Sequence, residues 1–213
     1  MKPILLFLLW FLPMSSLFAD GGDVAMVTLL RGGVFRVSPI GKQAVEAFTK
    51  LKHGDLLALD GDSRVQVVYL ENGRQETWSG AGKLEITKLE SNPVGLAPPE
   101  VKVLPAVMVK QIVKTPILES QGRGGMMRLR AVVTASDLQK IEDEYKKLRK
   151  ESTANDINPD LYLLSSMFEI KEYDKVEEAL TDLQQRQRGN AEVGLVVALY
   201  KKAVKNAKEA NKR

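Results

Sequence analysis

Cysteine is absent from the 213 residues, and histidine occurs only once, at His53. The lack of cysteine excludes disulfides and every nucleophile or metal site that needs a thiolate. With one histidine, a zinc site would need an unusual ligand set, and a serine–histidine–carboxylate triad would depend wholly on His53. We therefore predict that the chain is not an enzyme, with no catalytic, cofactor-binding or metal-binding residues and no cofactor.

Three short clusters resemble sites in composition but lack the spacing that the chemistry needs. Three aspartates lie next to glycines without the distal glutamate of a calcium loop, so turns explain them and the neighbouring His53: Asp55, Asp60 and Asp62. No nucleophile elbow surrounds the candidate serines Ser63, Ser79 and Ser91. Residues 122–125 (GRGG) lack the Gly-Lys-Ser/Thr ending of a phosphate loop, which favours a hinge.

Long hydrophobic runs are also lacking, except for one near the start of the chain. Lys2 precedes an apolar run at residues 4–12, which Pro13 ends, and Ala19 offers a cleavage site. The run is too short for a bilayer core, which needs about 20 apolar residues. We predict a signal peptide over residues 1–19, cleaved after Ala19, with a retained anchor as the alternative. The mature chain would then have no stable transmembrane span.

Export without disulfides favours the bacterial periplasm over a eukaryotic secretory route. The distribution of charge, in turn, argues against a nucleic-acid partner. The formal net charge of +4 is the sum of +1 from Lys2, +4 from residues 91–135 and +5 from residues 201–213, against −1 for residues 20–90 and −5 for residues 136–200. Basic charge gathered in a connector and a tail is not the footprint of a nucleic-acid-binding face. We therefore predict a periplasmic protein with no nucleic-acid partner.

Residues 24–90 have the pattern of an all-β module. Short apolar or alternating runs are separated by glycine turns, and Asn72-Gly73 is a strong hairpin signal between residues 64–70 and 74–79. We expect a small sandwich or a partly closed barrel, with a tight hairpin across Gly32-Gly33 and a meander through residues 51–79. Residues 43–52 suit either a short helix or an irregular strand.

The same residues resemble the FecR-like periplasmic domain family. The resemblance lies in Gly33-Val34, the L-x-x-G-D-x-L stretch from Leu51, the alternating run before Asn72-Gly73, and the L-x-I ending at residues 84–86. It covers residues 24–90. It implies a periplasmic sensing or protein-interaction role beside membrane signalling proteins. Unlike in the best-known regulators of that family, we expect no cytoplasmic segment ahead of the apolar run in this chain.

Residues 91–135 contain five of the nine prolines, which argues against continuous regular structure. We predict a proline-rich connector here. Within it, residues 107–113 suit a short helix or a strand, and residues 126–133 (MMRLRAVV) suit a strand that returns to the sheet of the first domain.

From residue 136 to 208 the apolar spacing becomes helical. Four helices are expected: residues 156–159 (DINP) cap the second, and breaks at residues 171–173 and 189–190 separate the others. Residues 157–190 have the thirty-four-residue period of the tetratricopeptide family and resemble it at Tyr173, Leu180 and Leu183. Leu164 and Val176 are larger than the small residues of that family, and a generic helical hairpin bundle is the alternative.

The fold class that follows is α+β with two domains, a β module and tetratricopeptide-like helical hairpins. The leading hypothesis is a non-catalytic periplasmic scaffold or sensory protein, whose sheet and concave helical side contact envelope or membrane signalling proteins. The alternative is a peptidoglycan- or polysaccharide-binding envelope protein. That alternative would use the aromatic residues Phe35, Tyr69 and Trp78 and a basic tail made of Lys201, Lys202, Lys205, Lys208, Lys212 and Arg213.

Overall fold

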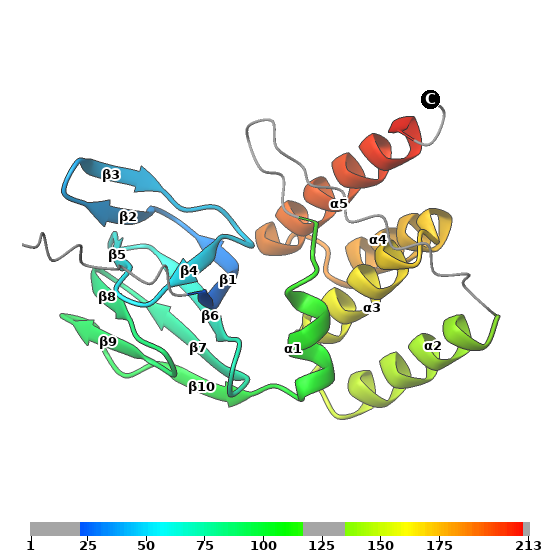
Figure 1. Ribbon diagram of the computed structural model, residues 1–213, viewed down its shortest axis with the longest axis horizontal. Helices are drawn as coiled ribbons and strands as arrows, with labels where there is room; N and C mark the ends of the chain where they lie inside the picture. Colours follow the sequence, from blue (N-terminus) through cyan, green and yellow to red (C-terminus); the bar gives the residue numbers. More distant parts are fainter. Residues whose placement is uncertain (1–21, 117–134, 211–213) are drawn as a thin grey trace, which may run out of the picture.

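The computed structural model describes residues 22–116 and 135–210, which form two antiparallel five-stranded sheets followed by helices (Figure 1). The first sheet has the order β10 (Glu100–Val103), β7 (Arg74–Ser79), β6 (Arg64–Tyr69), β1 (Asp23–Arg31), β4 (Lys50–Lys52). The second has the order β3 (Gly41–Ala44), β2 (Val34–Ser38), β5 (Leu56–Leu59), β8 (Gly82–Ile86), β9 (Ser91–Val94). The α+β class is therefore confirmed.

The two sheets pack face to face around one apolar core. Alternate residues of β6, among them Val65 and Val67, point into it, where they meet Leu57 and Leu84 of the second sheet. This alternation is what the period of two along a strand predicts for a sheet with one face against another. Over the described residues the sheets form a sandwich, and no closed barrel is present.

Two predicted strand pairings are wrong. The chain does not make a hairpin across Gly32-Gly33, because β1 pairs with β4 and β6 whereas β2 pairs with β3 and β5. Gly32, with φ of 77°, instead turns the chain from one sheet into the other. The predicted meander is likewise divided, since β5 belongs to the second sheet. Only the β6–β7 hairpin at Asn72-Gly73 is confirmed.

The segment between β2 and β5 contains no helix. β3 and β4 flank an irregular stretch in which Phe48 has φ of 65° and is fully buried. Its backbone N–H donates to the carbonyl of Val27, which fixes the stretch against β1. Phe48 occupies this unfavourable conformation because its ring enters the core shared with the helices.

Regular structure continues through the predicted proline-rich connector as β9, β10 and α1 (Ala106–Ile112). The prolines fit because of where they lie. Pro93 is on β9, an edge strand, where a missing N–H is tolerated, and Pro105 comes directly before the first residue of α1. The predicted hinge at residues 121–125 and the returning strand at residues 126–133 lie outside the described residues.

The C-terminal part is helical, as predicted, with α2 (Ala135–Lys150), α3 (Asn158–Glu169), α4 (Tyr173–Arg186) and α5 (Ala191–Ala210). Consecutive helices pack against each other. Of the described residues, no helix has the length and apolar character to cross a bilayer.

The helices cover the outer face of the first sheet, which gives three layers (Figure 1). Met26 and Val68 point away from the second sheet and share an apolar core with Ile112 of α1 and Leu161 of α3. A buried side-chain bond of 2.9 Å from Asn158 Nδ2 to Gln75 Oε1 also joins α3 to β7. The protein therefore has two apolar cores. One lies between the two sheets, and the other is shared by the β part and the helical part.

Replacing Gly73 with alanine is expected to destabilise the protein more than the same change at Gly54. Both glycines have positive φ, 71° and 87°, which costs alanine about 1–2 kcal/mol. At Gly73 the new Cβ would also lie 2.5 Å from the Leu104 carbonyl oxygen, an overlap that adds about 1–3 kcal/mol. At Gly54 nothing lies within 4 Å. Urea unfolding of both variants measures the difference, and equal losses would contradict the steric argument.

Candidate interaction surface

The aromatic residues considered for ligand binding are not available as a platform. Trp78 is 2% exposed and Tyr69 is fully buried, while Phe35 is half-buried. Trp78 and Tyr69 point into the core between the sheets. Both are therefore packing residues, and burial raises the pKa of Tyr69.

A buried carboxylate, Glu76, organises the polar groups around these rings. Its Oε2 accepts from Trp78 Nε1 at 3.0 Å and from the backbone N–H of Ser91 at 3.2 Å. Its Oε1 accepts from Arg74 Nε at 2.6 Å. The hydroxyls of Ser91 and Tyr69 lie 2.7 Å apart beside it. This cluster joins β7 to β9 across the sandwich, and sequence reasoning missed Glu76.

The turn residues behave as predicted for turns. Asp55 accepts from the Lys52 backbone N–H at 2.8 Å and pairs with Arg36 at 3.2 Å, while His53 is exposed. Ser63 Oγ donates to the Gly33 carbonyl at 2.7 Å, which fixes the turn between the sheets. No group of three potential metal ligands occurs among residues 22–116 and 135–210.

The predicted basic tail is only partly described. Lys201, Lys202 and Lys205 are exposed on α5. Lys208 Nζ instead lies 2.8 Å from Asp174 and 3.0 Å from Glu177, which ties the end of α5 to α4. Lys212 and Arg213 lie outside the described residues.

A groove of about 310 Å³ crosses the face of the helical layer between α2 and α4. Its floor is apolar, with Leu163 and Met167 of α3 and Ala179 of α4. Charged side chains form the rims, and Glu142 of α2 pairs with Lys175 of α4 at 3.0 Å across one end. An apolar floor with charged rims is the usual form of a protein-binding groove.

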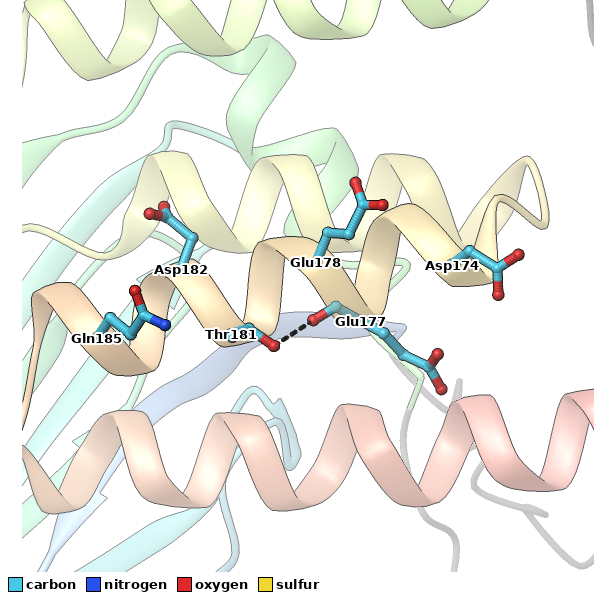
Figure 2. A pocket seen from close by; sticks show the side chains of 6 residues that line it. All are labelled: Asp174, Glu177, Glu178, Thr181, Asp182 and Gln185. Atoms are coloured by element: carbon cyan, nitrogen blue, oxygen red, sulfur yellow. Dashed lines mark hydrogen bonds between the residues drawn. The ribbon is translucent and has the colours of Figure 1, made fainter.

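The wall that α4 contributes is strongly acidic. Figure 2 shows four carboxylates along its outer side, interrupted by Thr181 and Gln185. Glu178 and Asp182 point toward the groove, whereas Asp174 and Glu177 lie farther along, near Lys208 of α5. Asp174 and Glu177 are three residues apart, and Glu178 and Asp182 are four residues apart, so each pair lies on one side of the helix.

A buried carboxylate beneath the groove holds its three helices together. Asp160 of α3 accepts from Tyr145 OH at 3.0 Å and pairs with Arg149 at 3.2 Å and Arg186 at 2.7 Å. Tyr145 and Arg149 lie on α2 and Arg186 lies on α4, so both walls of the groove are attached to one side chain. Burial, together with the charge of Asp160, raises the pKa of Tyr145 to about 12.

Tyr145→Phe is expected to lose its effect on stability at high pH. At neutral pH it removes a hydrogen bond to a charged group, which contributes about 1.5–3 kcal/mol. A folded-state pKa of about 12 exceeds the unfolded value of about 10. The contribution of neutral Tyr145 is therefore complete below pH 10 and is lost as pH rises through 12. Urea unfolding of the wild-type and Tyr145→Phe proteins across this pH range should show their difference in unfolding free energy shrinking. A constant difference would contradict the prediction.

Comparison with protein-family models, curated proteins and solved structures finds no match.

Proposed function

We propose that the chain is an exported, non-catalytic scaffold or sensory protein of the FecR-like kind, acting in the bacterial periplasm. Its partners are envelope or membrane signalling proteins. The helices act as tetratricopeptide-like hairpins that present a binding surface, and the sandwich supports them. The observation that carries this proposal is the groove between α2 and α4, with its apolar floor of Leu163, Met167 and Ala179.

Among residues 22–116 and 135–210, no other element fills the groove, so it is one open surface of the helical layer. On the opposite side of α3, Ser165 hydrogen-bonds Thr115 after α1 at 2.9 Å and Tyr200 of α5 at 2.6 Å. Residues two apart on a helix point about 200° apart, so Leu163 and Met167 face away from Ser165. Because α1 already packs on the sheet-facing side, a partner would meet the groove side instead.

Blocking the groove tests the proposal. Ala179→Arg places a long charged side chain on the half-buried floor, and Gln184→Arg places the same charge on an exposed part of α4 outside the groove. Tagged proteins are expressed in the source cells and their partners are isolated after cross-linking. We expect a discrete partner that Ala179→Arg loses and Gln184→Arg keeps. Equal capture by the two variants, or no partner at all, would contradict the proposal.

Binding to peptidoglycan or another polysaccharide is the second candidate, and it rests on the exposed lysines of α5. With Trp78 and Tyr69 buried, an aromatic platform does not support it. Co-sedimentation with purified peptidoglycan separates the candidates. A wall-binding protein would enter the pellet, and Lys201→Glu with Lys202→Glu would release it, whereas a protein scaffold stays in the supernatant.

A further inference from the structure

At the end of the helical layer, one face of α5 is not covered by any described part of the chain. Leu195 on this face is 49% exposed, and its neighbours are small: Ala191, Gly194 and Ala198. A Cβ added at Gly194 would meet no atom within 4 Å. Among the described elements, α3 packs against α1, α2 and α4, and α4 packs between α3 and α5, whereas α5 packs mainly against α4 and β1. An exposed leucine among small residues is suited to close packing against another helical surface.

The same face of α5 continues into basic residues. Lys202 lies seven residues, about 10 Å, beyond Leu195 on the same side of the helix. Lys201, Lys202 and Lys205 are exposed, and none of them forms an ion pair with the described part of the chain. The face is therefore apolar in its first half and cationic in its second.

The complementary character belongs to the α4 rim of the groove, whereas Lys146 of α2 also lines the groove and Lys175 of α4 is paired with Glu142. Residues 136–200 contain fourteen acidic and nine basic side chains, whereas residues 201–213 contain one acidic and six basic ones. Glu178 and Asp182 stand on the groove rim beside the apolar floor. Opposite charges next to matched apolar patches favour a defined orientation of two surfaces.

We propose that the exposed face of α5 docks in the groove of a second copy of this chain. Leu195 then lies on the floor formed by Leu163, Met167 and Ala179, and the α5 lysines face Glu178 and Asp182. The inference rests on the proposed function in one respect, since it takes the groove to be a protein-binding surface. The contact joins two different surfaces, so it is heterologous.

Sedimentation equilibrium over a range of concentrations, at low and at high salt, measures this association. The wild-type protein is expected to self-associate, and high salt is expected to weaken the contact because exposed charges are screened. Ala179→Arg blocks the groove, and Lys202→Glu with Lys205→Glu reverses the charge of α5. Each variant alone should associate at least about tenfold more weakly, and their equimolar mixture should form a one-to-one complex through the one intact groove and the one intact α5.

The absence of cysteine permits a test of the contact itself. Ala179→Cys and Leu195→Cys are made in separate proteins, which are mixed under mild oxidation. We expect a disulfide-linked heterodimer from this pair, and far less of it when Gln184→Cys replaces Ala179→Cys. Equal cross-linking by the Gln184→Cys protein would overturn the proposed contact.

A wild-type protein that stays monomeric at every concentration would also overturn the inference. If Ala179→Arg still abolished capture of an envelope partner, the groove would belong to another protein and the proposed function would stand. Self-association without any envelope partner would have the opposite meaning: the inference would hold and the proposed function would fail.

Discussion

Glu76→Ala is expected to destabilise the sandwich by about 3–5 kcal/mol, the usual cost of removing one partner from a buried ion pair. The Glu76 side chain is only 1% exposed. Without it, the Trp78 indole N–H and the Ser91 backbone N–H lose their acceptor inside the core, and each buried unsatisfied group costs about 1–3 kcal/mol. The guanidinium of Arg74 loses its closest carboxylate as well. Urea unfolding followed by Trp78 fluorescence measures the loss.

Glu90→Ala is the matched control, because Glu90 pairs with the same arginine. Its side chain is 60% exposed and lies 3.8 Å from Arg74 Nη2. An exposed pair of this kind contributes about 0–1 kcal/mol. The loss of stability in Glu76→Gln should lie between the losses in the two alanine variants, since glutamine keeps the volume and one acceptor but loses the charge. Similar losses for Glu76→Ala and Glu90→Ala would show that burial does not govern this cluster.

The local elements of the fold could be predicted from the sequence, whereas their pairing could not. The alternating residues of β6 and the turn at Asn72-Gly73 specify a hairpin within one short stretch, so that prediction is confirmed. Gly32 signals a turn equally well, but whether the next strand joins the same sheet depends on contacts far along the chain. One such contact is with Ser63, thirty-one residues later, which lies against Gly32.

The buried carboxylates escaped prediction for a related reason. A glutamate in a strand usually faces water, and neighbouring polar residues such as Gln75 and Thr77 strengthen that impression, yet both faces of β7 are covered. Asp160, in the first turn of α3, suggests only a favourable interaction with the helix dipole. Its arginine partners lie eleven and twenty-six residues away, and only packing of three helices brings them together.

Asp160→Ala is expected to cost about 3–5 kcal/mol and to loosen the groove, because it leaves Arg149 and Arg186 facing each other without their shared carboxylate. The Asp160 side chain is 4% exposed, so water cannot replace it without a change in packing. The Tyr145 hydroxyl loses its acceptor too. Thermal unfolding followed by helical circular dichroism measures the loss of stability, and hydrogen exchange in α2 should rise, since α2 is attached to α3 through this cluster.

Asp182→Ala is the matched control, because Asp182 pairs with the same arginine, Arg186, as the buried Asp160. Asp182 binds Arg186 Nε at 2.8 Å but is 62% exposed, so its removal should cost less than about 1 kcal/mol. Both variants remove one negative charge next to Arg186, and they differ in burial and in the number of helices that the carboxylate joins. If Asp160→Ala unfolds the helical layer while Asp182→Ala leaves hydrogen exchange in α2 unchanged, the groove depends on Asp160 for its shape. Binding measurements with Asp160→Ala would then report loss of the groove, whereas Ala179→Arg obstructs a groove whose walls are intact.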